Sequence, residues 1–392
     1  MRAPSSNPPL SVQRLRIAFV VDRFGNRFGG AEAYGVELMR ELSRHHDITI
    51  FAREYDQACG LSFPYVPIRH WSRWPGWIRS WIFARKAAQA TQSGFDIVHS
   101  HMNGWCGDVE VVHVTPVRYN WRIRSLPWFK KLSSYVSPRV AMYLYLEACR
   151  LKPGPQEVVA VSDLIAEQLR QAYGAVHSYP IIAPGVVLPQ GSSQANEREQ
   201  VRTHCGLQAH HIACLLVARN PLRKGLPTVL AALAKLPSHY RLIVVGGKPS
   251  LGDAMRKQLH ELKLQDRVVL LGETSNVEPY YRAADIYVHP TLNDSFGMAP
   301  LEAMSYGLPV ILSPSPWCGF AQYVDADHHA VLLSHPENVD ELTQAIHSLG
   351  ENRQLAQRLV ENSRVLLREF SWRSVAEHYE GLYQKIIKQR NA

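Results

Sequence analysis

The chain has 392 residues, more than one hydrophobic core usually organises, so we expect two domains. Its formal net charge is +9, and the excess lies in residues 1–190, which hold 22 Lys and Arg against 14 Asp and Glu, whereas the remaining residues hold 21 against 20. The six cysteines lack C-x-x-C spacing, which argues against a zinc site or a disulfide framework and favours a reducing cytoplasm.

The first residues, 1–12, contain Ser, Asn and Pro but no apolar stretch, and we expect them to form a flexible tail. Neither this segment nor any other has the pattern of a signal peptide, and no window approaches 18 uninterrupted apolar residues. We therefore expect neither secretion through a cleaved signal nor a membrane span.

The first half of the chain alternates strand patterns with helical patterns such as 32–43 and 163–173. Short apolar runs are typical of strands buried on both faces of a parallel sheet. They occur at 15–21, 47–51, 95–99, 109–115 and 158–162. This alternation predicts an α/β domain with right-handed crossovers.

A glycine pair, Gly29 and Gly30, opens the first predicted helix after the first strand. Glycines at a helix N-terminus let the backbone approach a phosphate closely. The alternative is a flexible turn in which Glu32 favours the start of the helix. The pair is not a G-x-G-x-x-G fingerprint, so NAD binding is not inferred.

Seven of the nine tryptophans lie between residues 71 and 128, and many of them neighbour Arg or Lys. Two segments, 69–86 and 120–131, combine these residue types as an interfacial membrane segment does. The alternative is a set of core aromatics with solvated basic faces. Because the first half also carries the charge excess, the sequence favours binding to an anionic membrane or lipopolysaccharide surface.

Polar residues at 96–113 follow or precede two predicted buried strands, and His101 and Asp108 are the most conspicuous. Ligands of α/β sheets bind at the carboxyl ends of the strands, so either side chain is a candidate for polarising a hydroxyl of a bound ligand. The alternative is that the histidine in this loop has only a structural role.

The second half repeats the alternation, with strand patterns at 213–218, 242–246, 268–271, 286–289 and 310–312. A polar, turn-rich segment at 190–200 separates the halves, and we place the domain boundary near Val187. The segment 371–387 is an amphipathic helix with Ser371 as its N-cap.

Cations gather after the first strand of the second half, at Arg219, Arg223 and Lys224. Such a loop can neutralise a departing diphosphate, with Arg making forked contacts and Lys a point contact. Solvated surface cations are the alternative. A D-x-D pattern at Asp325 and Asp327 is interpreted as a turn rather than a metal site.

Two carboxylates, Asp294 and Glu302, flank a turn that leads from the predicted strand 286–289 into a helix ended by Gly307. Free backbone N–H groups from Gly297 to Ala299 at this helix start favour an anion. A carboxylate on each side can accept hydrogen bonds from the hydroxyls of the anion's carrier. The alternative is an acidic residue at a helix start and a solvated Glu302.

The stretch 276–312 resembles the C-terminal signature of the family 4 glycosyltransferases, in which two Glu separated by seven residues lie between an "AD-hydrophobic" strand and a "G-x-P-V" strand. Here Asp294 replaces the first Glu, and Glu302 matches the second. The resemblance runs from about Arg16 to the C-terminus. It implies the GT-B fold: an α/β architecture of two Rossmann-like domains facing across a cleft, with 1–187 binding the acceptor, 188–371 binding the nucleotide sugar and the helix 372–392 returning to the first domain.

The resemblance also implies a retaining transferase that moves a hexose from a nucleotide-diphosphate sugar, with a UDP-sugar favoured, and that needs no metal or other cofactor. Its donor-binding residues would be Gly29, Gly30, Arg219, Lys224, Asp294, Phe296, Gly297, Met298, Ala299 and Glu302. Within this set, Arg219 and Lys224 would stabilise the leaving group, Asp294 would orient the sugar and Glu302 would hold the ribose. His101 and Asp108 match loop positions of the acceptor side.

The loop 313–324 is similar to one in lipopolysaccharide core glucosyltransferases of this family, through its C-G-aromatic-A run. The expected acceptor is therefore lipopolysaccharide core or another lipid-linked glycan, met on the inner face of the cytoplasmic membrane. A catalytically silent nucleotide-sugar sensor of the same fold is the alternative. No nucleic-acid-binding signature accompanies the basic charge, so a nucleic-acid partner is not expected.

Overall fold

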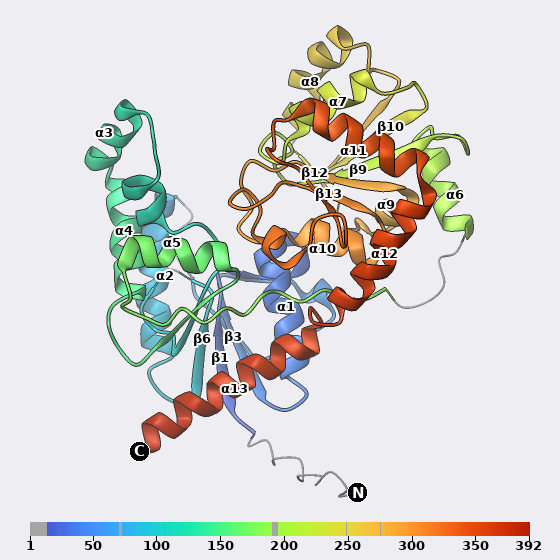
Figure 1. Ribbon diagram of the computed structural model, residues 1–392. Helices are drawn as coiled ribbons and strands as arrows, with labels where there is room; N and C mark the ends of the chain where they lie inside the picture. Colours follow the sequence, from blue (N-terminus) through green and yellow to red (C-terminus); the bar gives the residue numbers. More distant parts are fainter. Residues whose placement is uncertain (1–13, 70–72, 103, 190–194, 248, 275) are drawn as a thin grey trace, which may run out of the picture.

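The computed structural model describes residues 14–69, 73–102, 104–189, 195–247, 249–274 and 276–392. The predicted N-terminal tail and residues 190–194, the first part of the polar segment 190–200, lie outside these residues. The chain forms two α/β domains, each built from a parallel six-stranded sheet flanked by helices (Figure 1). The predicted fold class is confirmed. In the described part of the chain, no helix is long and apolar enough to cross a membrane.

The first sheet has the order β5-β3-β1-β6-β7-β8, in which every neighbouring pair is parallel. Counted along the chain this is the 3-2-1-4-5-6 order of a Rossmann fold, which reverses direction between β1 and β6. Its strands are β1 Arg16–Val20, β3 Asp47–Ala52, β5 Tyr65–Pro67, β6 Ile97–Ser100, β7 Val109–Val112 and β8 Glu157–Ala160. A two-stranded sheet, β2 Arg23–Phe24 with β4 Glu54–Tyr55, lies beside it.

The second sheet repeats the order, β11-β10-β9-β12-β13-β14, again entirely parallel. Its point of reversal lies between β9 and β12. The strands are β9 Ile212–Val217, β10 Tyr240–Val245, β11 Val268–Gly272, β12 Ile286–His289, β13 Val310–Leu312 and β14 Val331–Leu332. Each of the ten strand patterns corresponds to a strand. The short edge strands β5 and β14 were not predicted, because two or three partly exposed residues give too little apolar pattern.

Helices cover both sheets and supply most of the connections. Those of the first domain are α1 Gly30–Leu42, α2 Gly76–Ala90, α3 Trp128–Val136, α4 Pro138–Arg150 and α5 Asp163–Tyr173, with the short turns η1 Asn26–Phe28, η2 Gln57–Cys59 and η3 Tyr119–Ile123. Those of the second are α6 Ala195–His204, α7 Leu226–Lys235, α8 Pro249–Glu261, α9 Glu278–Ala283, α10 Met298–Ser305, α11 Val339–Glu351 and α12 Arg353–Leu367, with the turn η4 Gly319–Tyr323.

The last helix, α13 Trp372–Asn391, leaves the second domain and packs across the first (Figure 1). Its buried Tyr379 and Tyr383 hydrogen-bond to Tyr34 and His99 of the first domain, at 2.8 and 2.5 Å between the paired atoms. Ser371 caps the helix by accepting from the N–H of Ser374. The C-terminal helix is therefore part of the core of the first domain.

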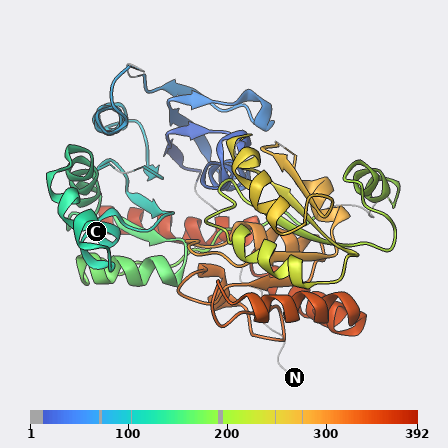
Figure 2. The same cartoon turned by 90° about the horizontal axis from the view of Figure 1, so that it is seen from above.

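The two domains meet through loops at the carboxyl ends of their strands (Figures 1 and 2). The Ser162 hydroxyl, which follows β8, donates to the carbonyl of Ser295, which follows β12, at 2.6 Å. The Arg219 guanidinium, which follows β9, donates to the carbonyl of Phe28 at 2.6 Å. Residues that follow strands of one sheet thus contact residues of the other domain at this edge.

Candidate functional site

Asp294 is the centre of a charged cluster in the loop after β12. Its Oδ2 lies 2.5 Å from Lys224 Nζ and accepts from His289 Nε2 at 2.9 Å. Burial alone would raise the pKa of Asp294, but the charge of Lys224 and the hydrogen bond from His289 outweigh it and hold that pKa well below its usual range. The carboxylate is therefore ionised throughout the neutral range.

Lys224 comes from the loop after β9, which packs directly against the loop after β12. Gly225 makes this approach possible: its φ is +86°, and a Cβ there would lie 2.0 Å from the carbonyl oxygen of Pro290. Besides Asp294, the Lys224 ammonium donates to the Asn293 carbonyl at 3.2 Å. An ammonium has three donors, so one remains for a ligand.

Arg219 lies in the same loop but faces the first domain and is 65% exposed. It reaches the turn before α1, where a Cβ on Gly29 would lie 3.2 Å from Arg219 Nη1 and 2.9 Å from Glu32 Oε2. The φ of Gly29 is +144°, which favours glycine at this N-cap. The structure thus brings Gly29 and the adjacent Gly30 next to a cation of the other domain.

Glu302, on the first turns of α10, is partly buried and accepts from the hydroxyl of Tyr281 at 2.8 Å. Burial raises its pKa, and the bond from Tyr281 opposes that rise only in part. Tyr281 itself is buried and stacks on Tyr306, with ring centroids 5.2 Å apart. The second carboxylate is therefore held by a buried side chain from α9.

The start of α10 lies between the two carboxylates. The N–H groups of Met298 and Ala299 belong to its first turn and have no acceptor within the helix, so they are available to an anion. Gly297 is its N-cap. The ring of Phe296, in contrast, is buried against Phe320, Tyr323 and Phe370, so the donor contact predicted for this residue would have to come from its backbone.

His101 lies at the carboxyl edge of the first sheet, where its N–H bonds to the carbonyl of Val20. Its Nε2 is 3.1 Å from His99 Nε2, and its Nδ1 is buried without a hydrogen-bond partner among the described residues. Burial and the nearby His113 hold the pKa of His101 well below its usual range. The ring is therefore neutral at pH 7, with one nitrogen engaged and the other enclosed by protein.

Asp108 lies at the opposite, amino-terminal edge. It precedes β7, accepts from the N–H of Val98 at 2.7 Å and pairs with Arg390 near the end of α13. Arg390 also donates to the carbonyl of Asp96, which precedes β6. The prediction that Asp108 acts on an acceptor is therefore wrong. Asp108 precedes a strand and lies at the amino-terminal edge of the parallel sheet, whereas His101 follows a strand and lies at the carboxyl edge.

Two residues at this site, His289 and Tyr281, were not singled out from the sequence, although each holds one of the carboxylates. A histidine ending an otherwise apolar strand, five residues before Asp294, is the signal that marks His289. Tyr281 carries no comparable signal, because tyrosine is common on apolar helix faces. The loop 313–324 also lies here, since the Asp294 N–H donates to the Trp317 carbonyl at 2.7 Å.

Asp325 and Asp327 form part of a turn, as predicted. The Asp327 N–H donates to the carbonyl of Ala330, and the N–H of Asp325 donates to the His329 ring. Across the described ranges, no group of three or more His, Cys, Asp or Glu side chains is placed to hold a metal ion. Each of the six cysteines is a free thiol.

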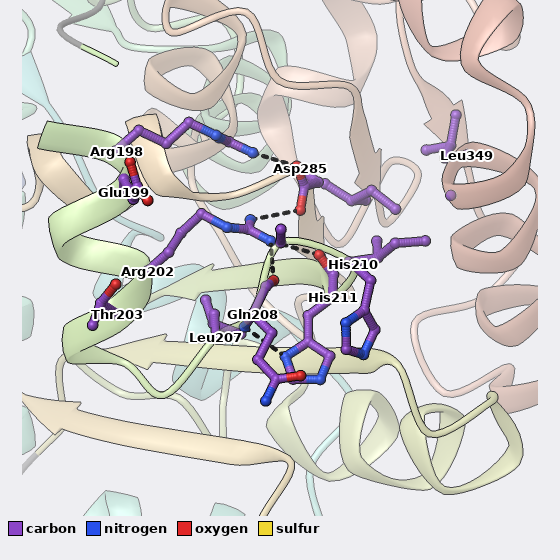
Figure 3. Close-up of a pocket in the computed structure, with 14 residues that line it drawn as sticks. Arg198, Glu199, Arg202, Thr203, Leu207, Gln208, His210, His211, Asp285 and Leu349 are labelled. Atoms are coloured by element: carbon purple, nitrogen blue, oxygen red, sulfur yellow. Dashed lines mark hydrogen bonds and ion pairs between the residues drawn. The ribbon is translucent and has the colours of Figure 1, made fainter. Parts of the chain in front are cut away.

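A cavity of about 670 Å³ lies elsewhere, at the amino-terminal edge of the second sheet (Figure 3). Arg198 and Arg202 converge there on Asp285, at 2.5 and 3.0 Å. Their remaining bonds go to backbone carbonyls such as Ala283 and His211. These arginines join α6 to the start of β12, so the cavity has a structural explanation and is separate from the cluster around Asp294.

Two family models match the chain. Residues 28–188 match Glycosyltransferase Family 4, and residues 199–366 match Glycosyl transferases group 1. The D-inositol 3-phosphate glycosyltransferase of Xylanimonas cellulosilytica is 27% identical over 93% of this chain and 93% of its own length. The lipopolysaccharide glucosyltransferase WaaG of Escherichia coli is 28% identical over 47% of this chain and 50% of its own length.

Solved structures share the architecture. The crystal structure of WaaG superposes with a TM-score of 0.79 at 19% identity and covers 94% of this chain and 99% of its own. HepE of Anabaena, in complex with UDP-glucose, superposes with a TM-score of 0.74 at 17% identity and covers 96% and 100%. Because both halves of the sequence match glycosyltransferase models and the two Rossmann domains match these structures, the chain belongs to the family 4 glycosyltransferases and has the GT-B fold.

Proposed function

We propose that this glycosyltransferase moves a hexose from a nucleotide-diphosphate sugar, with a UDP-sugar favoured, to a saccharide acceptor, with retention of configuration. The arrangement of Lys224 and Asp294 at the loop after β12 and of Glu302 on α10, with Arg219 at the turn before α1, supports this proposal most strongly. It combines two cations and free N–H groups for a diphosphate with two carboxylates for sugar hydroxyls. The complex of HepE with UDP-glucose is consistent with such a donor.

In this mechanism the bond between the sugar C1 and the diphosphate oxygen breaks, while the acceptor oxygen bonds to C1 on the same face. The acceptor proton passes to the departing phosphate oxygen. Arg219 and Lys224 stabilise the negative charge that builds on the diphosphate. In metal-dependent transferases a bound metal ion stabilises this charge. Asp294 orients the sugar, Glu302 accepts from the ribose hydroxyls, and the N–H groups near Gly29 and Gly30 face the diphosphate.

The decisive measurement is a panel of nucleotide sugars assayed for hydrolysis and transfer, with and without EDTA. We expect one donor to be consumed, and we expect the chelator to leave the rate unchanged within about twofold, because the protein cations replace a metal. Tight donor binding without turnover would favour the catalytically silent sensor instead. Loss of activity in EDTA that Mg²⁺ or Mn²⁺ restores would refute the metal-independent mechanism.

The acceptor is proposed to be a lipid-linked glycan such as lipopolysaccharide core, reached from the inner face of the cytoplasmic membrane. Helix α3 and the residues around it support this part. Trp128 is 77% exposed and Val136 79%, and Phe129, Leu132 and Tyr135 are exposed beside them. Residues 118–146 carry six Arg or Lys and no Asp or Glu. Figures 1 and 2 show α3 at the outer end of the first domain, away from the second sheet.

The segment 69–86 contributes less to this surface. Residues 70–72, and with them Trp71, lie outside the described residues. Trp74 is exposed, but Trp77 and Trp81 are partly buried on α2, whose Phe83 faces the core. The segment 120–131, together with the rest of α3, therefore presents a larger apolar and basic face than the segment 69–86.

Vesicle sedimentation tests this surface. We expect the protein to bind vesicles containing anionic lipid, and we expect binding to weaken as salt shortens the Debye length to about 8 Å at physiological ionic strength. Replacing Trp128 and Phe129 with Ala should reduce binding at least about tenfold, since each buried aromatic contributes about 1.5–3 kcal/mol. The matched control replaces Val365, an exposed apolar residue of α12, and should bind normally. If wild-type protein ignores anionic vesicles at low salt, the acceptor is a soluble molecule.

A further inference from the structure

His289 is the last residue of β12, and its side chain is fully buried beneath the cluster around Asp294. Its Nε2 lies 2.9 Å from Asp294 Oδ2, and its Nδ1 lies 3.4 Å from the hydroxyl of Tyr287. The His289 and Tyr287 rings stack with centroids 6.0 Å apart and an angle of 22°. The imidazole is thus fixed in place by a strand, a stacked ring and a hydrogen bond.

The protonation of His289 follows from these contacts. Burial lowers its pKa, and the nearby Asp294 raises it only in part, so the ring is neutral at pH 7. A neutral imidazole that bonds to a carboxylate must carry its hydrogen on the nitrogen facing that carboxylate. His289 therefore donates from Nε2, and its Nδ1 is left as an acceptor near the Tyr287 hydroxyl, whose one hydrogen also lies within reach of the Val217 carbonyl.

Both partners of Asp294 contact the same oxygen. Lys224 and His289 meet Oδ2, whereas Oδ1 receives no hydrogen bond from the described residues. Lys224 is a point charge on a flexible stem, so alone it neutralises the carboxylate without fixing its plane. The rigid imidazole adds that restraint and leaves Oδ1 free to accept.

We propose that His289 is a positioning residue for the donor sugar: its Nε2–H fixes the Asp294 carboxylate so that Oδ1 accepts a hydroxyl of the transferred hexose. This inference rests on the proposed function. An aspartate stands here where the family pattern has glutamate, and the shorter side chain reaches less far. Its orientation therefore matters more, because a misplaced carboxylate has no spare length with which to recover the contact.

The positioning role of His289 can be tested with substitutions that place an amide N–H at the position of either Nε2 or Nδ1 of its ring. The amide nitrogen of Gln extends to about the position of Nε2, whereas that of Asn extends only to about Nδ1. We expect His289→Leu and His289→Asn to lose about 10- to 100-fold in kcat/KM for the nucleotide sugar, the range for a hydrogen bond to a charged group. His289→Gln should stay within about fivefold of wild type.

Binding of UDP separates positioning from general structural damage. UDP lacks the hexose, so its Kd should change less than about twofold in all three variants, since Glu302 and the loop cations are left in place. In an Asp294→Asn background, His289→Leu should cost less than about threefold more, because the two residues act through one bond.

Several outcomes would overturn the inference. Wild-type kcat/KM in both His289→Leu and His289→Asn would do so, as would equal losses in His289→Gln and His289→Asn. A loss of UDP affinity that parallels the loss of kcat/KM would assign His289 a purely structural role. If His289→Leu fails to fold, the Gln and Asn pair still decides. A wild-type protein that consumes no nucleotide sugar would refute the proposed function itself, on which this inference rests.

Discussion

Replacing Glu302 with Ala is expected to weaken binding of the donor nucleotide at least tenfold. Hydrogen bonds to a charged group contribute about 1.5–3 kcal/mol each, and the proposed ribose contact involves one carboxylate that is already held in place by Tyr281. Isothermal titration calorimetry with UDP and with the nucleotide sugar measures the effect. The two losses should be similar, because both ligands contain the ribose.

The affinity should also depend on pH. Burial raises the pKa of Glu302 above that of an ordinary glutamate, and the protonated carboxyl has lost the charge that strengthens the ribose bonds. Binding should therefore be strongest above the raised pKa and decline as pH falls, starting at a higher pH than an exposed glutamate would give. Glu302→Gln serves as the control: it should bind weakly without this pH dependence. Unchanged affinity in a folded Glu302→Ala protein would refute the ribose assignment.

Replacing Lys224 with Met should reduce both turnover and stability, whereas Arg219→Ala should reduce turnover alone. The Lys224 side chain is 13% exposed and that of Asp294 20%, so Met would leave a mostly buried carboxylate with only His289 as partner. We expect a loss of stability of up to about 3 kcal/mol. Arg219 is largely solvated, so its removal should change stability by less than about 0.5 kcal/mol. Both variants should lose at least about 100-fold in kcat if their contacts strengthen in the transition state.

Denaturant unfolding and single-turnover kinetics separate the two effects. Lys224→Met combined with Asp294→Asn should recover stability but not turnover, because it removes the unpaired charge and the catalytic groups together. Since the pKa of Asp294 is depressed in the folded protein, the ion pair stabilises the fold above the usual aspartate pKa, and this contribution is lost as pH falls through the depressed value. A stable, fully active Lys224→Met protein would contradict both roles.

The arrangement of buried strands could be predicted from the sequence because apolar runs such as Ile286–His289 are fully enclosed and leave a continuous pattern. The edge strand Tyr65–Pro67 could not, since within the described residues it pairs only with β3 and its residues stay largely exposed. Helix α3 was not predicted as a helix. Residues 120–131 were interpreted only as an interfacial segment, and the apolar side chains of α3 are exposed in the structure.

At the site, the loop after β9 could be predicted to supply Arg219 and Lys224, and the loop and helix after β12 to supply Asp294 and Glu302, since strand ends of a parallel sheet share an edge. The contact between Lys224 and Asp294 could not, because it depends on how closely Gly225 lets two loops approach. Asp108 was assigned to the wrong edge although it directly precedes the predicted strand 109–115: the segment 100–108 starts at the carboxyl edge of the sheet but ends at the amino-terminal edge, and only its first residues lie near the strand ends that bind ligands. The roles of these residues remain predictions until the variants are measured.

The position of α13 constrains how this chain folds during synthesis. The last strand of the first sheet ends at Ala160, yet α13, whose Tyr379, Tyr383 and Ile386 are buried, begins only at Trp372. Domains usually fold in the order in which they leave the ribosome. Here the first domain must keep an apolar surface uncovered until the entire second domain has been translated. The residues that complete the first domain are therefore translated after the whole of the second domain.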